Sequence, residues 1–69
     1  MIHYIATRIQ NDSLDGAYLF DTLEEALEKA ESIARRTLGR EVYENERYSL
    51  EEIGEFKADT YTFSVYGIY

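Results

Sequence analysis

Residues 21–39 read DTLEEALEKAESIARRTLG and carry the clearest periodic pattern in the chain. Apolar residues recur every three or four positions, which is the spacing of one face of an α-helix. Thr22 and Glu25 have the spacing of a capping box, and Gly39 is suited to end a helix because glycine tolerates a left-handed backbone. The pattern predicts an amphipathic helix over about 22–38, whose core-facing residues are Leu23, Ala26, Leu27, Ala30, Ile33, Ala34 and Leu38.

The residues before this helix predict a β-hairpin. Residues 2–10, IHYIATRIQ, are rich in β-branched and aromatic residues and have apolar groups on both faces, which favours an inner strand. Asp15 and Gly16 in the next segment form a strong turn signal. Residues 17–20, AYLF, would then form a short second strand that completes the hairpin.

The segment after the helix permits more than one interpretation. Residues 41–45, EVYEN, are typical of a strand. Residues 47–57 fit either a short helical turn, because Ser49 and Glu52 have capping-box spacing, or one arm of a hairpin. We favour the strand and hairpin for the second half of this segment, near residues 53–57.

The last ten residues, TYTFSVYGIY, alternate in side-chain character and carry no charge. An uncharged aromatic strand at a free sheet edge would invite aggregation, so we expect a central strand or an edge covered by another subunit. In the second case the chain would form a homodimer through this C-terminal strand. Together the elements predict a single α+β domain over residues 1–69, with one helix on an antiparallel sheet of three to four strands in the order β(β)αββ.

Composition excludes several classes of protein. The 69 residues include no cysteine, so disulfides and thiolate zinc sites are excluded. The net charge of −7 argues against direct binding to nucleic acid or to an anionic membrane, because both require a basic patch. The sequence has neither a signal-peptide pattern nor an apolar run of the roughly 20 residues that a membrane helix needs, and we expect a cytoplasmic protein.

No catalytic or cofactor motif stands out in the chain. His3 is the only histidine, and the sequence offers it no evident partner for acid–base chemistry. A calcium-loop pattern that starts at Asn11 fails because its last position is Thr22 instead of glutamate. There is no phosphate-binding loop, dinucleotide fingerprint or nucleophile elbow. We therefore expect no enzymatic activity, no cofactor and no metal site.

The negative charge is concentrated after the predicted helix. Residues 21–40 hold five acids and four bases, whereas residues 41–59 hold seven acids and two bases, a net charge of −5. Two tyrosines lie among these acids, and tyrosine is enriched at interface hot spots. The segment is either solvated surface or a docking face for a basic protein partner. The residues expected to form such a face are Tyr43, Glu44, Glu46, Tyr48, Glu51, Glu52, Glu55 and Asp59.

In size, acidity, lack of cysteine and lack of catalytic residues, the chain resembles the small inhibitor proteins encoded by phages, including anti-CRISPR proteins and DNA mimics. The resemblance implies a stoichiometric inhibitor that acts in the host cytoplasm and occupies the basic nucleic-acid-binding surface of a defence complex, with carboxylates in place of phosphates. The alternatives are an oligomeric protein that binds or sequesters a small molecule between subunits, and a structural accessory domain without binding activity of its own.

Overall fold

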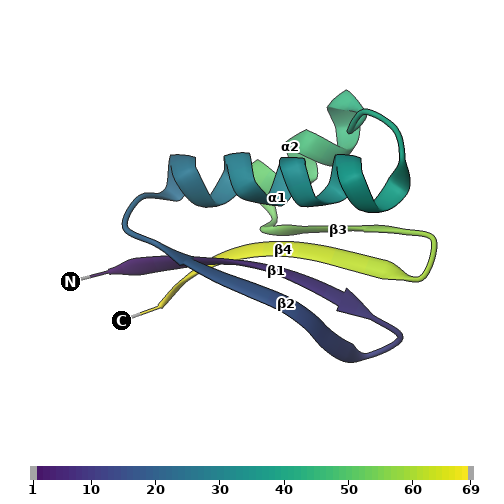
Figure 1. The fold of residues 1–69 in the computed structure, drawn as a ribbon. Helices are drawn as coiled ribbons and strands as arrows, with labels where there is room; N and C mark the ends of the chain where they lie inside the picture. Colours follow the sequence, from purple (N-terminus) through teal and green to yellow (C-terminus); the bar gives the residue numbers. More distant parts are fainter. Residues whose placement is uncertain (1, 69) are drawn as a thin grey trace.

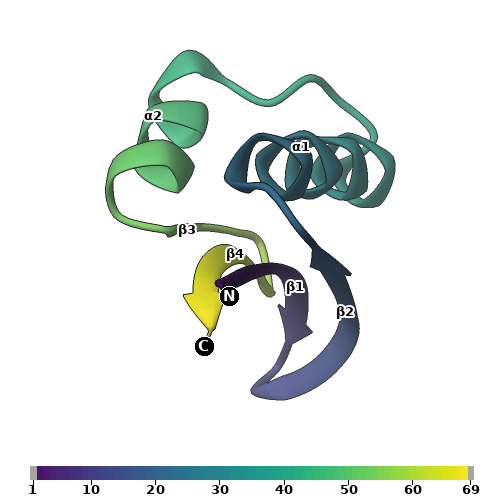
Figure 2. The same ribbon diagram turned by 90° about the vertical axis from the view of Figure 1, so that its left-hand side faces the viewer.

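The computed structural model describes residues 2–68 and shows an α+β fold, as the sequence predicts (Figure 1). The elements in chain order are β1 (His3–Gln10), β2 (Ser13–Phe20), α1 (Leu23–Leu38), α2 (Glu44–Glu52), β3 (Glu55–Ala58) and β4 (Tyr61–Ile68). The strands form one antiparallel sheet in the order β2-β1-β4-β3. Both helices lie on the same face of this sheet, as the end-on view in Figure 2 shows.

The predicted helix is confirmed together with both of its ends. The Thr22 hydroxyl accepts a hydrogen bond from the Glu25 backbone N–H at 3.2 Å and donates one to the Glu25 carboxylate at 2.9 Å. Gly39 has a φ of 69°, and its N–H donates to the Arg35 carbonyl oxygen at 2.9 Å. These contacts satisfy backbone groups that a helix leaves unpaired at its termini, so local sequence is sufficient to define α1.

The hairpin of β1 and β2 forms, but its predicted turn is misplaced. The turn lies at Asn11 and Asp12, whose φ values are 49° and 66°, instead of at Asp15 and Gly16. Two successive positive φ values suit a tight hairpin, and asparagine and aspartate tolerate them better than most residues. Asp15 is an extra residue in β2, where the register shifts between Arg8 and Ile9. This bulge lets the Asp15 carboxylate lie 2.7 Å from the Arg8 guanidinium.

The strand predicted for residues 41–45 is wrong, because helix α2 begins at Glu44. The Glu46 side chain accepts the backbone N–H of Tyr43 at 3.0 Å and so caps the first turn of the helix. The helix ends where Gly54, with a φ of 94°, donates its N–H to the Ser49 carbonyl oxygen. Both interpretations of residues 47–57 therefore hold in part, since the segment is helical up to Glu52 and a strand from Glu55.

The uncharged C-terminal segment is a central strand, as expected. β4 pairs with β1 from Tyr61 to Ile68 and with β3 from Tyr61 to Ser64. The half of β4 from Tyr61 to Ser64 is therefore protected on both sides within one chain, whereas β3 does not extend along its second half. Tyr69, which the prediction included, lies outside the described residues.

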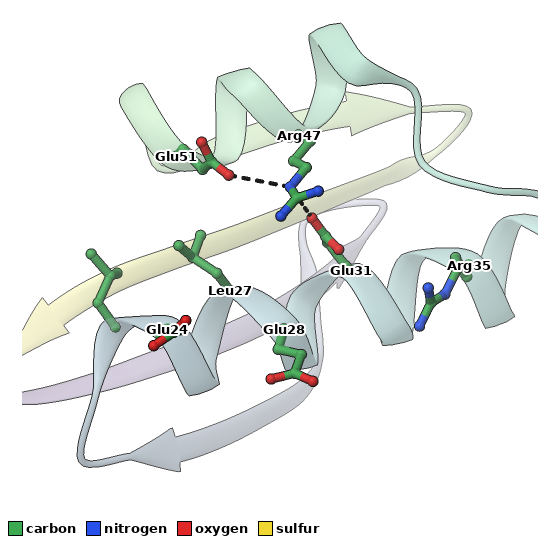
Figure 3. Close-up of a pocket in the computed structure, with 8 residues that line it drawn as sticks. Glu24, Leu27, Glu28, Glu31, Arg35, Arg47 and Glu51 are labelled. Carbon is green, nitrogen blue, oxygen red and sulfur yellow. Dashed lines mark hydrogen bonds and ion pairs between the residues drawn. The ribbon is translucent and has the colours of Figure 1, made fainter.

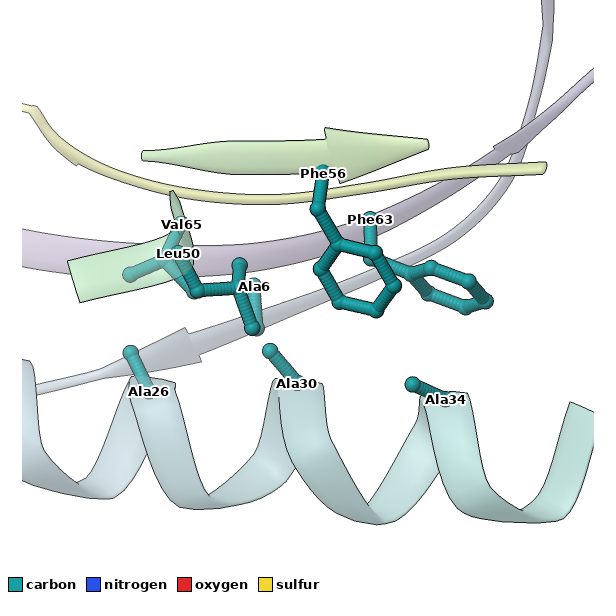
Figure 4. Packing of buried hydrophobic residues seen from close by; sticks show 8 residues of the cluster. All are labelled: Ala6, Ala26, Ala30, Ala34, Leu50, Phe56, Phe63 and Val65. Carbon is teal, nitrogen blue, oxygen red and sulfur yellow. The ribbon is translucent and has the colours of Figure 1, made fainter. Parts of the chain in front are cut away.

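The core lies between the sheet and α1, with a smaller contribution from α2. Three alanines of α1, at positions 26, 30 and 34, are completely buried and allow the helix to approach the sheet closely (Figure 4). They share one face because their spacing is four residues. The other buried apolar residues come from the strands and α2. They are Ala6, Leu50, Phe56, Phe63 and Val65.

Candidate functional site

A groove of about 690 Å³ runs between the two helices, which places it on the helical layer of the protein (Figure 3). Four of its side chains are carboxylates and two are guanidinium groups, so its lining carries a net negative charge. We call it the acidic groove. It is lined by Leu23, Glu24, Leu27, Glu28, Glu31, Arg35, Arg47 and Glu51.

Arg47 links the two walls of the acidic groove. Its Nε atom lies 2.8 Å from a carboxylate oxygen of Glu31 on α1 and 3.2 Å from one of Glu51 on α2 (Figure 3). Glu24 and Glu28 form no ion pair with any of residues 2–68, so their negative charge is not compensated locally. Leu23 is 44% exposed and adds apolar surface to the same groove. The groove thus combines uncompensated carboxylates with exposed apolar area.

Four of the eight residues predicted for a docking face lie together on the exposed side of α2. Glu44, Tyr48, Glu51 and Glu52 follow each other at helical spacing, so they share one side of the helix. All four are exposed, and Glu44 and Tyr48 also line a shallow depression with Asn45. This part of the predicted face borders the acidic groove, because Glu51 belongs to both surfaces.

Glu46 is largely buried and serves the fold, whereas Tyr43 is 57% exposed although its ring contacts Arg40. Both oxygens of the Glu46 carboxylate accept hydrogen bonds from the Arg40 guanidinium at 2.9 Å, and only 12% of the Glu46 side chain is exposed. The Arg40 guanidinium also stacks on the Tyr43 ring, 4.0 Å from its centroid. This arrangement holds the loop between the helices against the start of α2. The hydrogen bonds from Arg40 lower the pKa of the Glu46 carboxyl group.

Because its folded-state pKa is lowered, Glu46 should stabilise the protein above the ordinary glutamate pKa of about 4.3, and the contribution should disappear as the pH falls through the folded-state value. Glu46→Gln is expected to lower stability at neutral pH and to flatten the loss of stability on acidification. Urea unfolding at several pH values measures both effects, with Glu52→Gln as the control on the same helix. An identical pH dependence in wild type and Glu46→Gln would contradict this role.

The remaining two predicted residues lie elsewhere on the molecule. Glu55 alternates with the buried Phe56 along β3, so its side chain is on the sheet face opposite the helices. Asp59 is in the turn between β3 and β4, where its φ is 56°. The eight residues therefore do not form one continuous surface, and the acidic surface instead includes side chains of α1. The missed residues are Glu24, Glu28 and Glu31.

The spacing of the three missed glutamates could have been found in the sequence. Glu24, Glu28 and Glu31 stand at four- and three-residue intervals, so they occupy one stripe of the helix beside its apolar face. The net charge of the whole helix did not reveal this stripe, because the basic residues of the helix nearly balance its acids. What the sequence does not contain is the position of α2, which supplies the second wall of the groove.

A small cationic pocket lies on the other side of α1. Its lining includes Arg8, Lys29 and Arg36, and the Lys29 ammonium lies 4.6 Å from the centroid of the Tyr18 ring. The pocket has a volume of about 70 Å³, room for roughly two water molecules. Arg8 already pairs with Asp15 and donates to the Thr37 hydroxyl at 2.9 Å. Within one chain, this pocket offers little space for a small molecule.

The comparisons with known proteins add no family or relative. No protein-family model matches the chain, and neither curated proteins nor solved structures show significant similarity to it. Within residues 2–68 no helix is long and apolar enough to cross a membrane.

His3, for which the sequence offered no partner, has its Nδ1 atom 3.3 Å from a carboxylate oxygen of Asp21.

Proposed function

We propose that the protein is a non-catalytic binding protein that docks its acidic helical layer onto a basic surface of a partner protein. The observation that supports this most is the acidic groove, in which Glu24 and Glu28 of α1 have no cationic partner among the described residues. Glu44 and Glu52 extend the negative surface along α2. The partner would supply the missing positive charge, because an opposite potential gives both faster association and specificity.

An arginine- or lysine-rich segment suits this groove better than other occupants. Its cationic groups would pair with the free carboxylates, and its aliphatic stems would pack on Leu23 and Leu27 at the groove. Arginine can bind carboxylates through two parallel hydrogen bonds, as Arg40 does with Glu46 within this protein. Exposed Tyr48 on the neighbouring side of α2 would add apolar contact area.

The class of partner follows from the same chemistry. Protein surfaces with closely spaced arginine and lysine side chains are those that bind nucleic-acid phosphates, and carboxylates on a rigid helix can occupy such a surface in place of phosphates. This supports the resemblance to phage inhibitors of defence complexes, and the protein would act as an inhibitor at one copy per binding surface. A gel-shift or cleavage assay with a candidate defence nuclease tests this, with inhibition expected to saturate at a fixed molar ratio.

Reversing one charge in the groove is expected to weaken binding by roughly tenfold, because an attraction is replaced by a repulsion. The variant is Glu28→Lys, and the matched control is Glu55→Lys, which makes the same change in net charge on the opposite side of the sheet. Affinity for the nuclease, or for a labelled arginine-rich peptide as a generic probe, is measured by fluorescence anisotropy. The control should change the dissociation constant by less than about twofold.

Salt dependence separates this docking mode from apolar association. Binding through carboxylates should weaken steeply between low and physiological ionic strength, because exposed charges are screened. Equal losses in Glu28→Lys and Glu55→Lys would show that only the total charge matters and would contradict the acidic groove as the site. Binding that is insensitive to salt would contradict carboxylate docking altogether.

A further inference from the structure

The sheet face opposite the helices is uncovered and apolar. Side chains of β1 alternate, so the buried Ala6 points towards α1 whereas Ile5, Thr7 and Ile9 point to the opposite side. Among residues 2–68 both helices lie on the Ala6 side, and Figures 1 and 2 show no element over the other side. We call this side the outer face. The neighbouring strands add to it Leu14, Ala17, Leu19, Thr62, Ser64, Tyr66 and Ile68.

The exposed apolar side chains of the outer face are contiguous. Leu19 of β2 is 59% exposed and Tyr66 of β4 is 50% exposed, and Ile5 of β1 lies between them as the direct cross-strand partner of both. Leu14 is also exposed and stands opposite Ile9 at the far end of the hairpin. Single exposed apolar residues are normal on protein surfaces, but a continuous apolar patch of this kind marks an interaction surface.

The centre of the outer face can be covered without leaving an unpaired polar group. Thr7 and Ser64 stand opposite each other on β1 and β4, and their hydroxyl groups are hydrogen-bonded to each other. Both are buried although no helix covers them. Burying a hydroxyl group destabilises a protein mainly when the group lacks a hydrogen-bond partner. A contact that excludes water from Thr7 and Ser64 therefore leaves no unpaired hydroxyl group.

The outer face is also the side on which this chain carries almost no charge. Among the described strand residues of this face, Glu55 and Lys57 at the β3 edge are charged and have opposite signs, while His3 at the start of β1 has its Nδ1 atom 3.3 Å from a carboxylate oxygen of Asp21. The net charge of −7 therefore arises from the helical layer, the loops and the turns. Two copies repel each other least when their outer faces meet and their helices point away from each other.

We propose that the outer face binds a second copy of this chain, forming a two-fold homodimer with its helices on the outside. A two-fold axis brings the same patch of both subunits together, so the β3 edge of one copy can place Glu55 beside Lys57 of the other. A basic or acidic partner would find no net charge to pair with on this face. The homodimer differs from pairing of C-terminal strands edge to edge, because it joins the outer faces of the two sheets and not their strand edges.

The size of the outer face sets the expected affinity. Three strands of eight residues and one of four, about 4.8 Å apart with a rise of about 3.3 Å per residue, give a face of roughly 440 Å² in projection. Stable interfaces usually bury about 800 Å² per partner, so this contact lies below the standard size and among weak, transient contacts. We therefore expect a dimer that dissociates at roughly micromolar concentration.

Sedimentation equilibrium of the full chain over roughly 1 to 500 μM tests the proposal, a range that brackets the expected dissociation constant. The wild type should change from 8.1 kDa to twice that mass as concentration rises. Leu19→Lys should raise the dimer dissociation constant by about 30-fold or more, because the two-fold axis buries the substitution twice. The control is Ile53→Lys at the end of α2, where the side chain is 73% exposed, and it should change the constant by less than about twofold.

The substitution is chosen so that a change in the overall net charge cannot explain its effect. Leu19→Lys reduces the magnitude of the negative net charge, and Ile53→Lys does so equally. Circular dichroism checks that Leu19→Lys remains folded, and Tyr66→Lys replaces it if it does not. A wild type that remains monomeric throughout the range would overturn the proposal. An equal increase in the dimer dissociation constant for Leu19→Lys and Ile53→Lys would also overturn it. Neither result depends on whether the acidic groove binds a partner.

Discussion

Phe63→Ala is expected to remove about 3–5 kcal/mol of folding free energy, the usual cost of deleting a buried aromatic side chain. Phe63 is the largest side chain that is completely buried, and its ring centroid lies 5.1 Å from that of Phe56 and 6.0 Å from that of Tyr61. It stands on β4 in the centre of the sheet, facing the helices. The cavity left by alanine would have no neighbouring side chain free to fill it.

A domain of 69 residues has little stability to lose, because native proteins are stable by only about 5–15 kcal/mol and small domains lie at the low end. Phe63→Ala should therefore leave a large unfolded fraction at room temperature. Urea unfolding followed by circular dichroism measures it, with Tyr48→Ala as the control because Tyr48 is exposed on α2. A Phe63→Ala variant as stable as Tyr48→Ala would show that the helices do not pack on this side of the sheet.

Ala30→Leu is expected to cost about 1–3 kcal/mol or more, although leucine and alanine both favour helices. Ala30 is completely buried at the middle of α1, between Ala26 and Ala34 (Figure 4). Three extra carbon atoms have no space there unless α1 moves away from the sheet, and that movement would weaken every contact of the helix with β1 and β4. Thermal unfolding monitored by circular dichroism gives the effect.

The control for this prediction is Arg36→Leu, an exposed position on the same helix. Arginine and leucine have similar helix propensity, so this change should alter stability by less than about 0.5 kcal/mol. The two variants introduce the same residue and differ chiefly in burial. If Ala30→Leu were as stable as Arg36→Leu, the close approach of α1 to the sheet would not be a feature of the folded protein.

Predictions from short sequence patterns, such as helix caps, were reliable where the residues that contact each other are also close in the sequence. The cap of α1 depends on Thr22 and Glu25, which are three positions apart, and Gly39 ends the helix through its own backbone. The hairpin was predicted as an element but its turn was misplaced, because Asp15 and Gly16 form a stronger turn signal than Asn11 and Asp12, where the turn lies. Packing of both strand faces, and not turn propensity alone, selects the register.

The start of α2 was assigned to a strand, and its helical turn was only one of two interpretations, because several of its stabilising contacts are with residues outside it. Arg40 holds Glu46 from the preceding loop, and Arg47 pairs with Glu31 of α1 as well as with Glu51 in its own helix. Only Leu50 of this helix is buried, so the helix has a weak apolar face and its pattern resembles that of a strand. The docking residues predicted after α1 were consequently divided, with Glu55 on the opposite side of the sheet from Glu44 and Tyr48.

The amino-acid sequence by itself determined α1 with its caps, favoured an inner position for β1, and limited β4 to a central strand or a covered edge. It also fixed the absence of cysteine and the excess of acids, which are matters of composition alone. The helix and strands could be inferred because they depend on periodicity or on contacts within a few residues. Only the tertiary structure decided which acids stand together and which sheet face remains uncovered. Glu28 and Glu51 are far apart in the chain, and they line one groove only because α1 and α2 pack on the same face of the sheet.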